Sequence, residues 1–448
     1  MKNKIVQKLL VSKRMSSDFL AHRIEDYLAD VVGSLHALLD KRLCGTFVTL
    51  FTIILQFRNS KMGLLLSELG GYVCGFDHAP AGTKRISNLL RSKNWSAAVL
   101  DGFLFEKAKA RIHTLSAAGI RPLLLWDESV VEKAESWFLE GLCSVVSSKG
   151  KRLCKIKRGF YKPPLSRICV PGFRWTGVLL SALGQVPSVC QMSYWTTRGK
   201  YKEEGSNIVF RLLRACGEQI GSGALHVLDR GYASSWTLEW MSYFKQDFLV
   251  RWKKNHRLVH AQKGEKQTHL LARSFKAISR KIVSDKERKV SKHISVAYCG
   301  VTHPEFSDLP LWLVIVRDRK GHQPPMYLLT SIEVDSKQRA WEMVHSYMHR
   351  WGIEQAFRVG KCELGLESPR LWLWENRLKL LAMVSLVYDF LLSLLREWPD
   401  WVRLFLEKWC HRTGNRYKKA LLPIYRLRLA IANCLLAAFA FQLIQNSG

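Results

Sequence analysis

The chain has 448 residues, of which 48% are hydrophobic, so it holds enough apolar material for a sizeable core and about two to four domains. Its 69 Lys and Arg residues against 37 Asp and Glu residues give a formal net charge of +32. Such a charge attracts polyanions, so we expect nucleic acid as the partner ahead of a membrane surface or a ribosome.

The composition argues against several other classes of protein. The 11 cysteines are scattered, with no C-x-x-C pair and no Cys/His cluster at zinc spacing, which predicts reduced thiols in the cytoplasm. The basic start MKNKIVQKLLVSKRM has no long apolar stretch, so we expect no secretory signal. The apolar segments 378–395 and 429–444 contain polar residues such as Asp389 and Asn433, which predicts buried helices and no membrane partner.

Helical periodicity dominates the N-terminal quarter of the chain. Apolar residues recur every three or four positions from residue 8 to about residue 118, with few Gly or Pro breaks. We therefore predict a helical N-terminal domain at residues 1–118. Within it, the segment SNLLRSKNW (87–95) mixes basic and aromatic side chains, which suits contact with phosphates and equally suits an ordinary solvated helix face.

After residue 119 the pattern changes to short apolar runs that end in turns or carboxylates, as in the strands of a mixed sheet. The resulting order of three strands, a helix, a strand, a helix and a strand predicts an α/β domain at 119–252. The predicted strands are 122–126, 175–180, 188–195, 224–228 and 248–252, and the predicted helices are 206–219 and 236–244.

The next segment is rich in Lys and Arg and alternates apolar with polar residues, as in ISVAYCGV and LPLWLVIV. This pattern predicts a β-rich insertion at residues 253–335. Helical periodicity resumes near Lys337. We therefore assign residues 336–375 to the second part of the α/β domain and residues 376–448 to a helical C-terminal region.

Two aspartates directly follow predicted buried strands. Asp127 comes after LLLW, and Asp229 comes after HVL. An ionised carboxylate at the mouth of a buried strand is costly unless it is paired or binds a metal. If the two strands are neighbours, both carboxylates reach one cleft and would suit a hard divalent cation. For either residue alone the alternative is a helix N-cap, particularly for Asp127.

A third acid lies in the segment YMHRWGIEQAFRVGK (347–361). At about 100° per residue, Tyr347, Arg350, Glu354, Arg358 and Lys361 fall within a helical sector of about 80°. The helix would span about 21 Å, enough to follow several phosphates on either side of Glu354. Ion pairs four residues apart also occur on solvated helices, but such a face does not require Tyr347 and Lys361 in register.

These residues together resemble the DDE transposases of bacterial insertion sequences, in the branch called family four. Tyr347, Arg350, Glu354 and Lys361 satisfy the spacing Y-x2-R-x3-E-x6-K of its YREK signature. The segment VLDRGY is similar to the second-Asp motif of this family, and LLLWDES is similar to the first. The intervals between the three acids also fit, and the resemblance covers about residues 120–375.

The resemblance implies an RNase H-like mixed-sheet catalytic domain interrupted by a β-rich insertion, and the activity of a cut-and-paste DNA transposase. It implies that Asp127, Asp229 and Glu354 are the catalytic residues and hold two Mg²⁺ ions, for which Mn²⁺ would substitute. No covalent protein nucleophile is then required. The implied setting is the bacterial cytoplasm, in association with the nucleoid.

The resemblance also implies double-stranded DNA as the partner, at transposon ends and in the target, with a dimer on the paired ends. We further predict that the N-terminal domain, which the resemblance does not cover, binds a transposon end. Tyr347, Arg350 and Lys361 would hold phosphates near the scissile bond, and we add Arg358 from the helical wheel. Further predicted DNA contacts come from a basic loop between the first two sheet strands, for which a merely solvated loop is the alternative. Its cations are Lys149, Lys151, Arg152, Lys155, Lys157 and Arg158.

Members of this family can pass through a hairpin at the transposon end, with an aromatic residue stacked on a flipped base. Trp252 and Trp312 are candidates for this role, with core packing as the alternative for each. Two other functions remain open at this point. One is an RNase H-type metal nuclease that cuts without joining, and the other is a DNA-binding protein with an inactive site.

Overall fold

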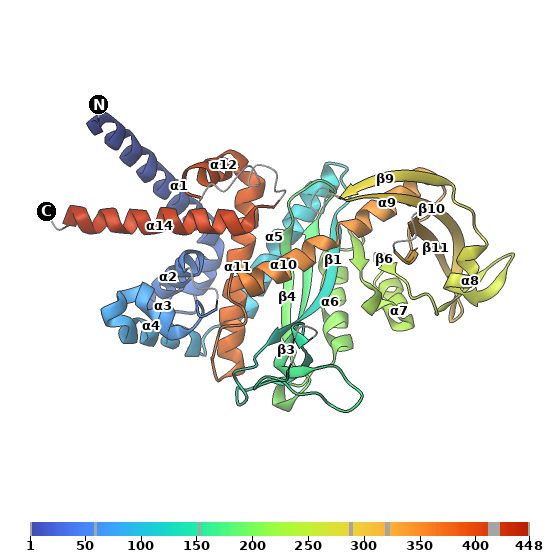
Figure 1. The fold of residues 1–448 in the computed structure, drawn as a ribbon, viewed down its shortest axis with the longest axis horizontal. Coiled ribbons are helices and arrows are strands. Elements are labelled where there is room, and N and C mark those ends of the chain that lie inside the picture. Colours follow the sequence, from blue (N-terminus) through green and yellow to red (C-terminus); the bar gives the residue numbers. More distant parts are fainter. Residues whose placement is uncertain are drawn as a thin grey trace.

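One mixed sheet of 12 strands runs through the part of the chain that the computed structural model describes, with helices on both of its faces (Figure 1). The described residues are 2–57, 61–150, 153, 155–285, 290–318, 323–410 and 422–446. The strand order is β2-β3-β1-β5-β6-β12-β11-β10-β7-β8, with β4 paired to β3 and β9 paired to β10.

Five of these strands form the centre of the fold. The strand β1 (Leu123–Glu132) pairs antiparallel with β3 (Cys169–Ser181) and parallel with β5 (Leu225–Leu228). On the antiparallel side β4 (Ser188–Trp195) follows β3, and on the parallel side β6 (Asp247–Arg251) follows β5. The order β4-β3-β1-β5-β6 with these directions is that of an RNase H-like fold, so the predicted fold class is confirmed.

The connections follow from the strand directions. Parallel neighbours need a crossover, and α7 (Ser235–Tyr243) joins β5 to β6. The helix α6 (Gly205–Gln219) leads from β4 into β5 after a short 3-10 helix, η3 (Gly199–Tyr201). The structure adds β2 (Cys143–Val146), an edge strand that the sequence did not predict because four residues are too few to show an alternating pattern.

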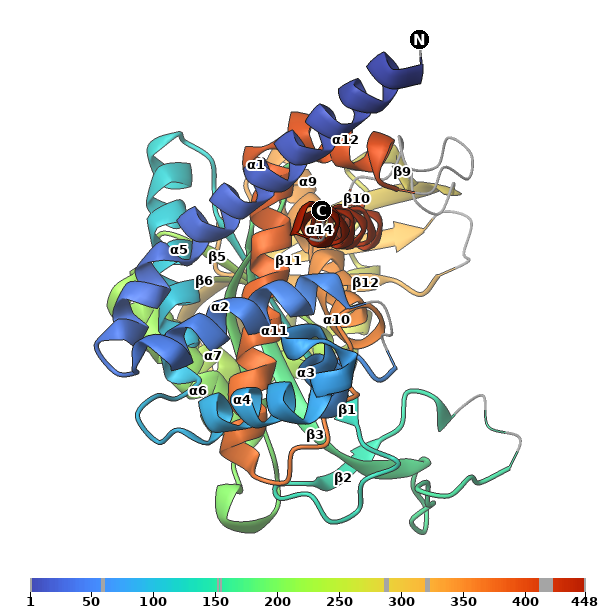
Figure 2. The same ribbon diagram turned by 90° about the vertical axis from the view of Figure 1, so that its left-hand side faces the viewer.

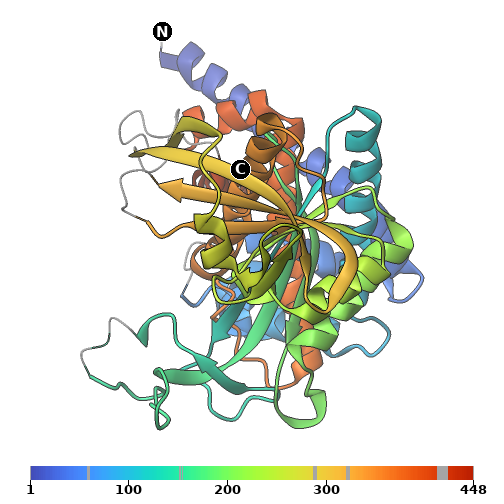
Figure 3. The same cartoon turned by 90° about the vertical axis from the view of Figure 1, so that its right-hand side faces the viewer.

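The predicted β-rich insertion continues the same sheet. Its last strand pairs antiparallel with β6, so the strands of the insertion lie beyond the parallel half of the central sheet (Figure 3). Its elements are β7 (Arg257–His260), β8 (Gly264–Gln267), α8 (Thr268–Arg273), β9 (Ser279–Asp285), β10 (Val290–His303), β11 (Phe306–Asp318) and β12 (Met326–Thr330).

Helices from both ends of the chain pack together on one side of the sheet (Figure 2). The helix α11 (Trp374–Glu397) lies between the N-terminal helices and β4. The N-terminal group comprises α1 (Lys2–His36), α2 (Lys41–Gln56), α3 (Leu66–Cys74), η1 (Phe76–His78), α4 (Ala79–Arg91) and α5 (Ala98–Ala117), and the C-terminal group adds α12 (Pro399–Lys408) and α14 (Ile424–Asn446).

Side chains of β1 alternate between two hydrophobic clusters. Leu123 and Leu125 pack in the cluster that contains α9 (Lys337–Met348), α10 (Trp351–Cys362) and α11, whereas Leu124 and Trp126 pack in the cluster that contains α6 and α7. Successive residues of a strand point to opposite faces. Asp127, two residues after Leu125, therefore belongs to the face that α9 and α10 cover.

The helix α11 is long and apolar enough to cross a membrane, but 89% of its most apolar window is buried inside the protein. Its carboxylate Asp389 is buried and accepts hydrogen bonds from the Tyr27 hydroxyl of α1 (2.9 Å) and the Val189 N–H of β4 (2.8 Å). The prediction of a buried helix at residues 378–395 is therefore confirmed. A single carboxylate joins three elements that are far apart in the sequence.

We expect Asp389→Ala to lower the free energy of unfolding by about 1–3 kcal/mol, because it leaves the Val189 N–H without its buried acceptor and leaves the Tyr27 hydroxyl only the Leu386 carbonyl, at 3.2 Å. Guanidinium denaturation curves measure this change. Asp400→Ala, at an exposed ion pair on α12, is the control and should change it by less than about 0.5 kcal/mol. Equal losses for the two variants would contradict the assigned role of Asp389.

Candidate active site

The sheet register brings Asp127 and Asp229 to the same level on neighbouring strands. Leu125 of β1 pairs in parallel register with Val227 of β5, and each aspartate lies two residues beyond that pair. Asp127 is inside β1, which continues to Glu132 because its second half pairs with β3 alone. The alternative of a helix N-cap for Asp127 is therefore wrong. Asp229 directly follows β5 and precedes the 3-10 helix η4 (Arg230–Tyr232), without making a side-chain cap.

The third acid comes from a pair of helices that follow one another across the face of the sheet (Figure 1). The prediction of one continuous helix over residues 347–361 is wrong, since α9 ends at Met348 and α10 begins at Trp351. Tyr347 lies in the last turn of α9, Arg350 caps the start of α10 and Glu354 is in its first turn. The chain turns between Tyr347 and Arg350. The relative directions of these two side chains are therefore set by the turn and cannot be read from one continuous helix.

Two hydrogen-bonding side chains from this helix pair connect the three acids. The Tyr347 hydroxyl donates to Asp229 Oδ1 at 3.0 Å. The Arg350 guanidinium donates to Asp127 Oδ2 at 2.8 Å and also to Glu354 Oε1. Asp127 and Glu354, which are separated by more than half of the chain, are therefore bound by the same cation. The structure brings together all three predicted acids and two of the four other helix residues named with them.

The site concentrates negative charge in a partly buried place. Burial, with smaller contributions from the charges of Asp229 and Glu354, raises the pKa of Asp127 to about 6 against the opposing effect of Arg350. Burial, with a contribution from the charge of Asp229, raises the pKa of Tyr347 to about 12. Burial alone would lower the pKa of Arg350, but the surrounding carboxylates raise it above its ordinary value. The three acids are thus close enough to repel one another, and Arg350 balances part of that charge.

Carboxylate oxygens are the ligands that Mg²⁺ prefers, so the donor chemistry of Asp127, Asp229 and Glu354 suits this ion. In the arrangement of the described residues, no group of three or more His, Cys, Asp or Glu side chains is placed to hold a metal ion. The guanidinium of Arg350 takes the position of the cation between Asp127 and Glu354. One oxygen of Asp127 and one of Glu354 are thus already bonded to a cation.

The remaining signature residue, Lys361, lies beside the strand that carries Asp127. Its Nζ donates to Ser129 Oγ at 2.8 Å, and burial lowers the pKa of its ammonium group. Ser129 is two residues after Asp127 and points to the same face of β1. Arg358, by contrast, is exposed on α10 and takes no part in the hydrogen-bond network of the acids within the described structure.

The predicted basic loop lies between β2 and β3, and its described cations Lys149, Lys155, Lys157 and Arg158 are exposed. Lys151 and Arg152 lie outside the described residues. Next to the loop is a groove of about 940 Å³, which also reaches Lys361. The sequence did not single out three of the groove's basic residues, because nothing but charge distinguishes them from other surface cations. These are Lys61, Lys133 and Arg370.

The two tryptophans considered for base stacking differ in exposure. Trp252 is 1% exposed and packs against the rings of His256 and His303, so base stacking by Trp252 is wrong. Trp312 is half-buried and packs against Tyr298 at a ring distance of 6.1 Å. Core packing therefore accounts for Trp252, while base stacking by Trp312 stays a prediction.

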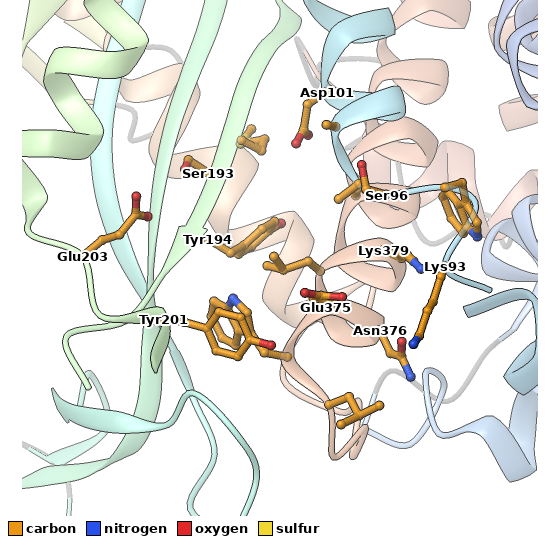
Figure 4. A pocket seen from close by; sticks show the side chains of 18 of the residues that line it. Lys93, Ser96, Asp101, Ser193, Tyr194, Tyr201, Glu203, Glu375, Asn376 and Lys379 are labelled. Carbon is orange, nitrogen blue, oxygen red and sulfur yellow. The ribbon is translucent and has the colours of Figure 1, made fainter. Parts of the chain in front are cut away.

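A second cavity, of about 810 Å³, lies between the α4–α5 connection, β4 and the start of α11 (Figure 4). Asp101 and Tyr194 line it, and burial raises the pKa of Asp101 to about 7. None of Asp127, Asp229 and Glu354 lines this cavity. The acidic cluster and this cavity are therefore separate features.

The fold and the site together define an RNase H-like protein in which acids from β1, from the end of β5 and from a covering helix converge. Residues 206–390 match the family described as "Transposase DDE domain". The matched segment includes Asp229, Glu354 and the whole YREK spacing, while Asp127 precedes it. Over these residues the chain is similar to DDE transposases.

Comparison with whole proteins adds little to this. No curated protein matches the chain. Among solved structures the chain is similar to a piggyBac transposase synaptic complex with hairpin DNA, at 13% sequence identity and a TM-score of 0.42. The likeness covers 90% of this chain and 73% of that chain. The assignment of the fold rests on the strand order and directions described above.

A buried polar chain lies directly behind the two aspartates. The Trp126 indole N–H donates to His226 Nδ1 at 3.0 Å, and His226 Nε2 lies 3.1 Å from Gln246 Oε1, which fits a neutral ring with its proton on Nε2. Burial lowers the pKa of His226 to about 4. These bonds connect β1 with β5 one residue before Asp127 and three residues before Asp229.

The lowered pKa of His226 predicts a loss of stability in mild acid. Between pH 6.5 and pH 4 the unfolded chain binds a proton at His226 that the folded protein does not, so stability is fully present above pH 6.5 and falls as the pH decreases. Between pH 7 and pH 5 the free energy of unfolding should fall by about 2 kcal/mol less in His226→Gln than in the natural protein. Denaturation curves at the two pH values measure it. An identical pH dependence of the variant and the natural protein would exclude this role for His226.

Proposed function

We propose that this protein is a cut-and-paste DNA transposase, with Asp127, Asp229 and Glu354 as its catalytic acids. The proposal depends most on one observation: Tyr347 and Arg350 are hydrogen-bonded to acids that come from three distant parts of the chain. A plain salt-bridge face on a solvated helix would not reach an acid inside β1 and another at the end of β5. The family match at residues 206–390 supports the same conclusion.

Double-stranded DNA, at the element's ends and in the target, is the proposed substrate, bound by a dimer on paired ends. The net charge of +32 supports a polyanion. The basic groove supports DNA close to the acids, because its residue Lys361 is bonded to Ser129, two positions from Asp127. The sequence spacing Y-x2-R-x3-E-x6-K further suggests the YREK branch of bacterial insertion sequences. Its four residues are Tyr347, Arg350, Glu354 and Lys361.

Mg²⁺ is the proposed cofactor, held by Asp127, Asp229 and Glu354, with Mn²⁺ as a substitute. Bound there, a divalent ion would supply Lewis-acid stabilisation of a phosphodiester and lower the pKa of an attacking water or 3′-hydroxyl. The chain's own part is to position the acids and the DNA. Tyr347 orients Asp229, Lys361 is placed to bind a phosphate, and Arg350 can exchange its two carboxylates for a phosphate once a metal neutralises them.

We expect Asp127→Asn, Asp229→Asn and Glu354→Gln each to lower Mg²⁺-dependent cleavage of element ends by about 1000-fold or more, because each removes a proposed metal ligand. Binding of the end duplex should stay within about twofold of the natural protein's. Single-turnover cleavage and fluorescence anisotropy measure the two quantities. Glu342→Gln, on α9 but outside the acidic cluster, is the matched control and should cleave normally.

The cleavage assay, with a target plasmid added, also distinguishes the transposase from a metal nuclease and from an inactive DNA-binding protein. Cleaved ends without any product joined to a target plasmid would favour a nuclease of RNase H type. An unchanged cleavage rate in Asp229→Asn would remove catalysis from that residue and leave a DNA-binding protein. Joined products that depend on all three acids support the transposase.

The position of Arg350 generates a prediction that needs no DNA. In Arg350→Ala the carboxylates of Asp127 and Glu354 lose a competing cation, so the affinity for Mn²⁺ alone should rise about tenfold. Isothermal titration with Mn²⁺ measures it, and Arg358→Ala, an exposed arginine on the same helix, should leave the affinity unchanged. Weaker Mn²⁺ binding in Arg350→Ala would mean that the guanidinium supports the metal site instead of competing with the ion.

A further inference from the structure

Two loops beside the basic groove are joined into one unit, which we call the two-loop edge (residues 133–141 and 367–374). The Lys133 ammonium group of the first loop donates to the carbonyls of Glu367 (2.6 Å) and Pro369 (2.7 Å) in the second. The Glu140 N–H donates to the Trp372 carbonyl at 3.1 Å. Segments more than 200 residues apart are therefore held as one surface.

This edge is anchored to the core below it. Arg377 of α11 is fully buried, and its guanidinium donates to the Glu140 carbonyl of the first loop (3.0 Å) and to the Leu371 carbonyl of the second (2.8 Å). An ion pair of 2.5 Å between Arg370 and Glu135 adds a third connection at the surface. The backbone of both loops is thus fixed by buried as well as exposed contacts.

On this fixed backbone the two loops expose their largest apolar side chains. Phe138 is 81% exposed, Trp372 is 61% exposed and Trp137 is 50% exposed. Leu373, beside Trp372, is also exposed. Large rings held in water on a rigid support mark a surface that binds a partner.

The loops that carry these rings also wall the basic groove, which reaches Lys361, and Lys361 is bonded to Ser129 two positions from Asp127. The groove is lined by six basic side chains against three carboxylates, and both loops contribute to its walls. Lys149 and Arg370 form ion pairs with groove carboxylates, and Lys133 is buried and bonded to loop carbonyls, so the remaining cations carry the unbalanced charge. The basic side chains are Lys61, Lys133, Lys149, Lys157, Lys361 and Arg370. From Asp127 to the end of β1 the strand covers about 17 Å, which is the length of sheet that separates Asp127 from the first loop of the edge.

Cations that follow a backbone, combined with exposed rings on which bases stack, are the features by which proteins bind single-stranded nucleic acid. A duplex keeps its bases stacked on one another and offers no base faces to Phe138 or Trp372. A second copy of the chain, which also carries a net charge of +32, would be repelled from this basic region. The chemistry therefore favours an unpaired DNA strand over a protein partner.

We propose that the two-loop edge is a stacking platform for unpaired bases of the DNA strand that passes the acidic cluster. The inference rests on the proposed function, since it takes DNA to be the polyanion in the groove. Trp137, Phe138 and Trp372 would hold bases by their ring faces, without reading sequence, while the exposed cations of the groove, which exclude Lys133, hold the phosphates. The site is distinct from Trp252 and Trp312 of the sheet.

The test uses the full chain without divalent metal, so that the DNA stays intact. Fluorescence anisotropy measures the affinity for a 20-nucleotide single strand and for its duplex. We expect Trp137→Ala/Phe138→Ala and Trp372→Ala each to weaken single-strand binding by about tenfold and duplex binding by less than about twofold. Tyr243→Ala and Phe76→Ala, which remove exposed rings elsewhere, are the controls and should change neither affinity. Phe138→Trp should retain single-strand binding, because it keeps a ring at that position.

Each other result overturns the inference. Unchanged single-strand binding in the ring variants would overturn the stacking platform. If duplex binding is normal in that case, the proposed function still stands. An equal loss on both forms of DNA would assign the rings a structural role. A change in the sedimentation of the ring variants without a change in DNA binding would identify the edge as an interface between copies. Absence of binding to either form by the natural protein would remove the proposed function as well.

Discussion

The hydrogen bonds from Tyr347 and Arg350 to three carboxylates are the interactions on which this site depends. Asp127, Asp229 and Glu354 are close enough for the charges of the last two to raise the pKa of the first. Partial burial strengthens the repulsion among them, because a low dielectric screens charges less than water does. The protein compensates with Arg350 and with the Tyr347 hydroxyl, both supplied by the junction of α9 and α10. A fold would not retain such an arrangement for stability alone, which is why the site is the natural place to look for function.

The rest of the fold can be understood as support for that junction. The parallel register of β1 and β5 sets two acids level with each other, and the buried chain from Trp126 through His226 to Gln246 fixes the two strands behind them. On the opposite flank, β12 pairs with β6, so the insertion returns the chain to the sheet before α9 begins. The long excursion between Asp229 and Glu354 therefore does not loosen the site.

The basic residues of this protein serve two different purposes. Arg377, Lys379 and Lys133 are buried and donate to backbone carbonyls, so they hold loops and helices in place. Lys155, Lys157 and Arg158 are exposed beside the groove, where counterions would collect and a polyanion would replace them. Net charge alone does not separate the structural cations from those available to a partner. Their hydrogen-bond partners do, and on that basis the loop between β2 and β3 carries cations available to a partner.

The sequence by itself determined the fold class, the three acids and the signature residues, because these depend on local signals. Apolar runs that end in Asp127 and Asp229 reflect strands whose buried and exposed positions are set within a few residues, and the YREK spacing is visible without any knowledge of packing. The buried character of α11 could be predicted for the same reason. Its Lys379 and Asp389 need protein partners, which a lipid environment would not supply.

Only the tertiary structure decided how these parts meet. The break between α9 and α10 follows from packing on the sheet, since the helical pattern of residues 347–361 runs through it without interruption. The bond from Arg350 to Asp127 joins residues 223 positions apart, and the exposure of Phe138 and Trp372 depends on two loops that Arg377 holds together. Local periodicity carries no information about such distant contacts, because they arise from the register of strands and the volume left between elements.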